Sequence, residues 1–329
     1  APAVERLQRL RDAAEEEGDV VDLPPRAPQP DTLPTIEQIS TASCSRAQRA
    51  YVAALLACEW CDLVGGLGSV EREWFMAASR HSLGGQFLVA VPRGSHFAMG
   101  PAVFQTAVRH RLREVQPVAL SVPTCGACGR DVDREATHYV SCRGVSGAGG
   151  GNYLAALHNS VVWTLCCMLR AVHGVARVRL EDVVGAAHYS PGHRPDITVL
   201  DAGGVGSHTL VEVTVFRPTA PTYHRPTLRR APGEALQARQ EQRRRDYGDV
   251  GPHRLMVFAL ADYGQLSTDA ARVLQECVEA REDRLDLEEE QATWACRSFS
   301  SFWRQRLSVV LATGVATCIL RQAQRDWRL

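Results

Sequence analysis

The chain has 329 residues, of which 45% are hydrophobic and 22% charged, and its 37 basic residues balance its 37 acidic ones. This length can bury a sizeable core, and the composition excludes a chain that is disordered throughout. A net charge of zero argues neither for nor against a nucleic acid partner, so the charge has to be read locally. All the basic residues are arginine, which fits a GC-rich coding bias better than a functional demand for guanidinium.

The eleven cysteines are spread along the chain, and no signal peptide is visible at its start. This pattern favours a reducing compartment, nuclear or cytoplasmic, and metal-bound or free thiols over disulfides. The most apolar C-terminal run, 307–320, is too short to span a membrane, so we expect neither secretion nor a membrane partner. The first residue is Ala, and we expect a piece of a larger protein.

Four segments are predicted in chain order. Residues 1–34 contain a short charged helix and a Pro-rich linker. Residues 35–120 have helical apolar spacing, for example at 101–112, where Pro101 stands in the first turn. Residues 121–150 are an irregular Cys-rich stretch followed by a Gly-rich joint, and residues 151–329 form the α/β part of the chain.

Helix and strand patterns alternate in this last segment. A buried helix is predicted at 153–172, an Arg-rich helix at 231–247, and two more helices near 266–290 and 291–326. Strands are predicted at 176–184, 196–200, 209–216 and 254–260. This order predicts an α/β core with helices packed on a sheet.

The Cys-rich stretch has the spacing C-x2-C-x9-H-x3-C, formed by Cys125, Cys128, His138 and Cys142. Zinc in structural sites takes four such ligands in a tetrahedron, so the spacing predicts a structural zinc knuckle with no open coordination position. The alternative is four unrelated residues in a loop. A second C-x2-C pair, Cys58 and Cys61, lies in an apolar helical run and is more typical of buried free thiols.

Two acids lie inside apolar strand patterns. Asp196 shares a strand face with Thr198, and Glu212 shares one with Thr214, so the two carboxylates could converge across a hairpin. Buried carboxylates are unfavourable unless they are paired or bind a cation. Mg²⁺ prefers such oxygen ligands, and a water that it activates can hydrolyse a phosphodiester. The alternative is that both acids form ion pairs with arginines such as Arg194 or Arg217.

The order of these motifs resembles a known family. The knuckle is followed by His158 and Asn159 in a helix, by Glu181, by Arg-Pro-Asp at 194–196, by Glu-Val-Thr-Val at 212–215 and by an Arg-rich helix that ends in Tyr247. This order is similar to the restriction-like endonuclease region at the C-terminal end of site-specific non-LTR retrotransposon reverse transcriptases, which has the PD-(D/E)xK nuclease fold. The resemblance covers about residues 85–265 and depends on motif order.

The resemblance implies a restriction-endonuclease-like core, a mixed sheet flanked by helices, preceded by a mainly helical region and the knuckle. It implies that Asp196 and Glu212 hold a catalytic Mg²⁺ or Mn²⁺, and that Glu181 is a further acidic ligand or orients a water. The implied reaction is nicking of target DNA, which frees a 3′ hydroxyl to prime reverse transcription. The expected partners are DNA, also RNA, and a reverse transcriptase domain. Further candidate site residues are His158, Arg243, Arg244 and Tyr247.

The chain departs from the family pattern at one position. The pattern has a lysine two residues after the Glu or on the following helix, but position 214 is Thr and the chain contains no lysine. Arg243 or Arg244 could stabilise the developing negative charge on the phosphate, although arginine cannot act as a base. Residues 223–254 contain eight arginines and four acids, which fits either phosphate binding or a solvated helix face.

Three alternatives therefore stay open. The first is an active endonuclease. The second is a nuclease fold without chemistry that holds nucleic acid or braces a polymerase on the same polypeptide. The third is a structural zinc protein with no nucleic acid partner.

Overall fold

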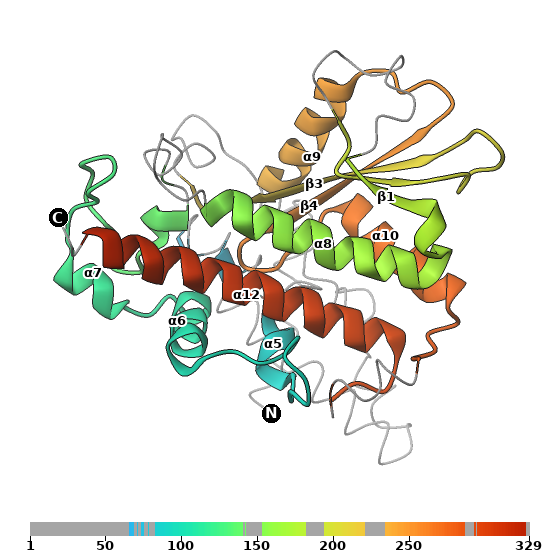
Figure 1. Cartoon of the computed structure of the whole chain (residues 1–329). Helices are drawn as coiled ribbons and strands as arrows, with labels where there is room; N and C mark the ends of the chain where they lie inside the picture. Colours follow the sequence, from blue (N-terminus) through green and yellow to red (C-terminus); the bar gives the residue numbers. More distant parts are fainter. Residues whose placement is uncertain are drawn as a thin grey trace, which may run out of the picture. The chain divides into compact units, whose positions relative to one another are not determined.

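The computed structural model describes residues 66–68, 71, 74–75, 78, 83–140, 142, 153–181, 194–220, 234–286, 293 and 295–326. The chain divides after Met76 into two units, and the helices and strands labelled in Figure 1 belong to the second unit, Ala77–Leu329. The predicted segment 1–34 and the pair Cys58 and Cys61 lie outside the described residues.

A four-stranded mixed sheet forms the centre of the second unit. Its strands are β1 (Val178–Leu180), β2 (Ile197–Val199), β3 (Thr209–Phe216) and β4 (Arg254–Ala261), and they lie in that order across the sheet. Strand β2 is antiparallel to both β1 and β3, and β4 is parallel to β3. The parallel pair is joined through helix α9 (Glu234–Tyr247), since parallel neighbours need a crossover connection. The expected α/β class, with a mixed sheet flanked by helices, is confirmed.

Helices cover both faces of this sheet. Helix α8 (Tyr153–His173) contacts β1, β2 and β3. The hydrophobic core on this face of the sheet includes Val213 of β3 and Phe258 of β4. On the other face, Leu236 of α9 packs with Val257 and Ala259 of β4. In Figure 1, α8 passes in front of the strands and α9 lies behind them. Because β3 is covered on both faces, it reads in the sequence as a nearly continuous apolar run.

The outer edge of β4 is protected by the start of helix α10 (Thr268–Ala280). Ser267 caps this helix by accepting a hydrogen bond from the amide of Ala270. The Ser267 hydroxyl also bonds to the backbone of Val257 and Ala259, and the Asp269 carboxylate accepts the Val257 amide at 3.0 Å. The backbone groups of an edge strand are thereby satisfied within the chain.

A long helix, α12 (Phe299–Asp326), runs beside α8 (Figure 1). It also packs against the short helices that precede the sheet in the chain. These are η2 (Leu83–Gly85), α5 (Gln86–Val89), α6 (Pro101–Leu112) and α7 (Pro117–Ser121). Helices α8 and α12 contact each other at Gly314, where an added Cβ would lie 2.3 Å from Cδ1 of Leu157. A side chain at this position requires Leu157 to shift.

The last two helices are shorter than predicted. The helix expected to reach 290 ends at Ala280, because Glu282 and Asp283 adopt positive φ angles of 49° and 54°. The helix expected from 291 begins at Phe299, where the Asp283 carboxylate accepts the amide of Ser300. An acidic side chain on the unpaired amides of a first turn fixes where a helix starts.

The predicted strand 176–184 is also shorter. The short helix η5 (Val175–Arg177) precedes β1, and the strand ends at Leu180 because Glu181 has a φ of 47°.

Residues Ala155–His173 of α8 would be long and apolar enough to cross a membrane, with a hydropathy of 1.3. In the structure this stretch contacts both the sheet and α12. The apolar residues of this helix that face the sheet and α12 belong to the hydrophobic core.

Candidate functional site

The register of β2 and β3 brings Asp196 and Glu212 together. Ile197 pairs with Val211 in this antiparallel ladder. Asp196 precedes Ile197 and Glu212 follows Val211, so the two acids lie opposite one another. The Asp196 carboxylate reaches across to β3, where its Oδ2 accepts the Val213 amide at 2.7 Å. The predicted convergence of the two acids is thus present in the structure.

Glu212 is an unfavourably placed acid. It is 7% exposed, and burial followed by the neighbouring charge of Asp196 raises its pKa to about 7, against the opposing effects of Tyr247 and Arg243. Two adjacent carboxylates in a poorly solvated position resist simultaneous ionisation. A bound cation would remove this conflict, so the electrostatics of the pair fit a divalent metal.

Tyr247 holds Glu212 in place from the end of α9. Its hydroxyl lies 2.7 Å from Oε2 of Glu212 and 2.8 Å from the carbonyl oxygen of Arg194. Burial and the negative charge of Glu212 raise the pKa of Tyr247 far above its ordinary value, so the hydroxyl keeps its single proton. It donates this proton to Glu212 when Glu212 is ionised.

His158 of α8 contacts the other acid. Its Nε2 lies 3.0 Å from Oδ1 of Asp196, and this hydrogen bond raises the pKa of His158 despite partial burial. The predicted alternative, ion pairs with arginines, is therefore present for Glu212 alone and with a different arginine. Asp196 pairs with His158, and Glu212 lies 3.6 Å from Nε of Arg243, whereas neither acid pairs with Arg194 or Arg217.

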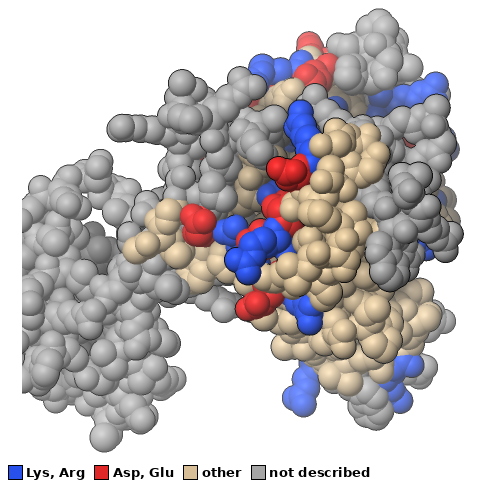
Figure 2. Space-filling view, turned by 90° about the vertical axis from the view of Figure 1, so that its left-hand side faces the viewer, with Lys and Arg blue, Asp and Glu red and all other residues tan. Residues whose placement is uncertain are grey.

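Two arginines of α9 point to this site, and one of them was not a candidate. Nε of Arg239 donates to Oγ1 of Thr214 at 3.2 Å, at the position where the family pattern has lysine. Arg239 and Arg243 are four residues apart and share a helix face. This spacing was the signal in the sequence that could have identified Arg239. Figure 2 shows basic and acidic side chains gathered next to one another on the surface that it displays.

Two predicted site residues lie elsewhere. Arg244 is on a different face of α9, where its guanidinium contacts the buried Asp269 of α10 at 2.7 Å. Glu181 has an exposed side chain, and its backbone amide donates to the carbonyl of Asp196. Neither side chain joins the acidic pair, which therefore consists of Asp196 and Glu212.

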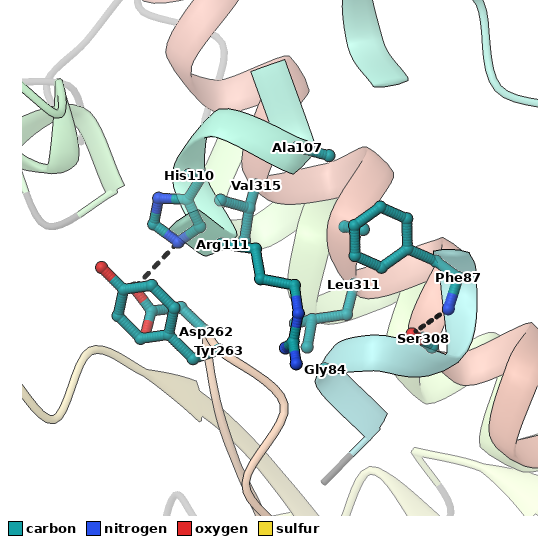
Figure 3. Close-up of a pocket in the computed structure, with 11 residues that line it drawn as sticks. Gly84, Phe87, Ala107, His110, Arg111, Asp262, Tyr263, Ser308, Leu311 and Val315 are labelled. Atoms are coloured by element: carbon teal, nitrogen blue, oxygen red, sulfur yellow. Dashed lines mark hydrogen bonds and ion pairs between the residues drawn. The ribbon is translucent and has the colours of Figure 1, made fainter. Parts of the chain in front are cut away.

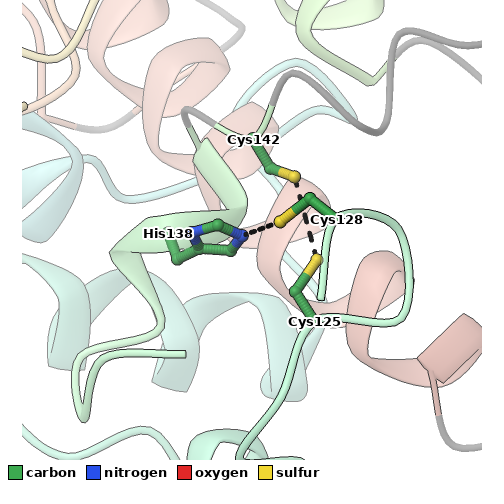
Figure 4. A group of neighbouring side chains, drawn as sticks. All are labelled: Cys125, Cys128, His138 and Cys142. Atoms are coloured by element: carbon green, nitrogen blue, oxygen red, sulfur yellow. Dashed lines mark hydrogen bonds between the residues drawn. The ribbon is translucent and has the colours of Figure 1, made fainter. Parts of the chain in front are cut away.

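The four side chains of the predicted knuckle come together in a separate cluster (Figure 4). All their ligand atoms lie within 4.8 Å of one another, with Sγ of Cys125 3.7 Å from Sγ of Cys142 and Sγ of Cys128 3.2 Å from Nε2 of His138. These four residues could bind a metal ion such as zinc. Among the residues that the structure describes, no other group of three or more His, Cys, Asp or Glu side chains is arranged in this way.

Local backbone structure positions these four ligands. In the turn that contains Cys125 and Cys128, the amide of Gly129 donates a hydrogen bond to the carbonyl of Cys125. Gly129 itself has a positive φ of 69°. The carboxylate of Asp133 accepts the amides of Thr137 and His138 at 2.7 Å each, which fixes the start of η3 (Thr137–Val140). Burial raises the pKa of Cys125 to about 12, so a thiolate there needs a cation.

The structure also contains a buried pair that the sequence did not indicate (Figure 3). His110 of α6 stacks on Tyr263, and its Nε2 lies 3.7 Å from Oδ2 of Asp262 beside a cavity of about 20 Å³. Burial lowers the pKa of His110 to about 3 and raises that of Asp262 to about 7. A cavity of this size holds no more than a water molecule, so this pair cannot receive a polymeric substrate.

Neither a scan of protein-family models nor a search of curated proteins finds a match to this chain.

Proposed function

We propose that the chain is the metal-dependent DNA endonuclease region of a retroelement protein, with a restriction-like PD-(D/E)xK core. The observation that carries the proposal is the convergence of Asp196 and Glu212, with Arg239 and Arg243 on the helix that faces them. The motif order of the sequence and the mixed sheet flanked by helices support it. The substrate is target DNA, and the partner is a reverse transcriptase domain that acts in the nucleus or cytoplasm, with RNA as its template.

The residues of the chain have separable tasks in this proposal. Asp196 and Glu212 would hold Mg²⁺ or Mn²⁺, which when bound supplies an activated water and neutralises phosphate charge. The Val213 amide and His158 orient Asp196, and Tyr247 orients Glu212. Arg243 and Arg239 bind the oxygens of the scissile phosphate, as charge-assisted donors do at phosphoryl centres.

Arg239 takes part of the task that the family pattern gives to lysine. Its contact with Thr214 places a guanidinium beside the strand position that lysine would occupy. Because arginine stays protonated, it stabilises negative charge and does not remove a proton from water. The Cys/His cluster, with zinc bound, is a structural brace since all four positions of a tetrahedral ion are occupied by protein ligands.

Nicking of supercoiled plasmid in Mg²⁺ or Mn²⁺ tests this function. We expect the native chain to produce open circles and Glu212→Gln to lose at least about a hundredfold in rate, because even residues that only support metal ligands typically contribute 10–100-fold. The matched control is Glu241→Gln, an exposed acid on α9 that contacts Gln237. Equal rates for all three proteins would refute the role of Glu212.

A second candidate is a nuclease fold that binds nucleic acid without cutting it. The observation that favours it is the absence of lysine, with Thr214 and Arg239 at the corresponding place. Under this alternative, a folded and zinc-loaded chain binds DNA in a gel-shift assay and yields no open circles with either metal.

A further inference from the structure

A groove of about 590 Å³ runs between α8 and α12. Its floor is apolar and is formed by buried side chains that include Leu157, Val309 and Cys318. Its rim is polar, with Asn159 and Ser160 on α8 and Thr313 and Thr317 on α12. The two helices lie side by side in Figure 1.

The charged side chains among the described residues that line the groove are Arg306 and Arg321 of α12, and none of these lining residues is acidic. The exposed His96 also lines the groove. The two arginines are fifteen positions apart, or about 22 Å along the helix axis. Burial and the guanidinium of Arg306 lower the pKa of His96. An anionic chain that follows α12 would therefore find a basic side chain at each end.

Trp163 provides an aromatic surface in the same groove. Its side chain is 51% exposed, and the guanidinium of Arg170 lies 5.7 Å from the centre of its ring. This cation–π contact holds the indole in place. Apolar aromatic surface that a chain leaves exposed beside basic residues is the combination with which proteins bind unpaired bases.

The groove is connected to the acidic pair through α8. His158, which contacts Asp196, and Asn159, which lines the groove, are consecutive residues of this helix. At 3.6 residues per turn, Ala156, Ser160 and Trp163 lie about 140–200° around the helix axis from His158, so the groove and the acidic pair lie on opposite sides of α8.

We propose that this groove binds a single strand of nucleic acid, with a base stacked on Trp163 and phosphates on Arg306 and Arg321. A duplex presents phosphates and sugars on its outside, which would leave the apolar floor unused, whereas unpaired bases cover an apolar floor. This inference rests on the proposed function, since nicking of a duplex leaves a strand end that can unpair.

Fluorescence anisotropy of labelled oligo(dT) and oligo(U) with the full-length chain tests the groove, without added Mg²⁺ and without a chelator. We expect Trp163→Ala to weaken binding roughly tenfold. We expect Arg321→Ala to weaken binding and to reduce the slope of log affinity against log salt by about 0.7, the value for one phosphate contact to a single strand. The matched control Arg272→Ala, an exposed arginine of α10, keeps the parental affinity and slope.

Trp163→Phe separates stacking from folding. Phenylalanine still stacks on a base, so affinity is retained within roughly twofold, while the quenching of tryptophan fluorescence on binding is lost. Unchanged affinity in Trp163→Ala and Arg321→Ala, or tighter binding of a matched duplex than of the single strand, would overturn the proposal. A difference between oligo(dT) and oligo(U) identifies which nucleic acid the groove prefers.

The two proposals fail in different ways. Binding of oligo(dT) that depends on Trp163, without nicking of plasmid, would support the groove and refute the endonuclease. Nicking of plasmid, with single-strand binding that does not depend on Trp163, would support the endonuclease and refute the groove.

Discussion

The Cys/His cluster and the acidic pair are built in opposite ways. The four ligands of the cluster come from one stretch of eighteen residues, 125–142, and surround a single point. The acidic pair is assembled from α8, β2, β3 and α9, and its carboxylates are held by His158, Tyr247 and a backbone amide. The first site has four candidate metal ligands, whereas the second has two acids that are held by neighbouring side chains.

This difference indicates what each site does for the chain. A closed set of soft ligands stabilises the fold when a metal binds, because the unfolded chain cannot offer the same site. A buried acid with a raised pKa, such as Glu212 beside Asp196, costs stability, which is typical of a site arranged for chemistry. Substitution of a cluster ligand should therefore lower the free energy of unfolding of the chain, whereas neutralisation of Glu212 should raise it.

The largest effect is expected at the cluster. Cys142→Ser should remove bound zinc and lower the free energy of unfolding by more than about 4 kcal/mol, because the loss of a structural metal is among the largest single-residue effects. Zinc content by atomic emission and urea unfolding measure both effects. The control is Cys167→Ser on α8, a partly buried thiol outside the cluster. Similar small losses in both variants, with no zinc in the parent, would show that the cysteines are ordinary buried thiols.

An effect of opposite sign is expected at Glu212. Its pKa is raised from 4.5 to about 7 in the folded state, so the folded state retains a proton that the unfolded state releases between these pH values. Its contribution to stability is therefore fully present below about pH 4.5 and is lost as the pH rises through about 7. Glu212→Gln should increase the free energy of unfolding by roughly 1–3 kcal/mol at pH 8 and have little effect at pH 4. Urea unfolding at both pH values, without added divalent metal, measures the difference, and a loss of stability at pH 8 would contradict it.

The smallest effect is expected at Tyr247. Its hydrogen bond lowers the pKa of Glu212, so Tyr247→Phe should move the pH midpoint of nicking upward by about one unit and reduce the rate at neutral pH by roughly tenfold. A pH series of plasmid nicking measures the midpoint. A uniform loss of rate at every pH would indicate that Tyr247 has only a packing role.

Local sequence patterns predicted the parts of the structure that depend on local geometry. Strand alternation placed Asp196 and Glu212 together because the side-chain period of a strand is fixed. The spacing of the Cys/His cluster was sufficient because all four ligands lie in one short segment. Helix α6 and strand β3 have the predicted bounds, 101–112 and 209–216.

The parts that were not predicted depend on contacts between distant segments. Arg244 was a site candidate, but the buried Asp269 on α10 binds it. Arg239 was not a candidate, because its role depends on how α9 packs over Thr214. The pair of His110 and Asp262 joins residues far apart in the sequence, and no local pattern marks either one. The catalytic, metal and domain assignments that resemblance suggested remain predictions for the experiments above.

The missing side chain at Gly314 has a consequence for how the two sites on α8 could change together. Because α8 carries both His158 and Trp163, its distance from α12 sets the width of the groove and the reach of His158 toward Asp196 at once. A Cβ at 314 would lie 2.3 Å from Cδ1 of Leu157, so either the Leu157 side chain or α8 itself has to shift. Position 314 therefore acts as a spacer between the two helices, through which evolution or an engineer could alter the groove and the position of His158 in a single step.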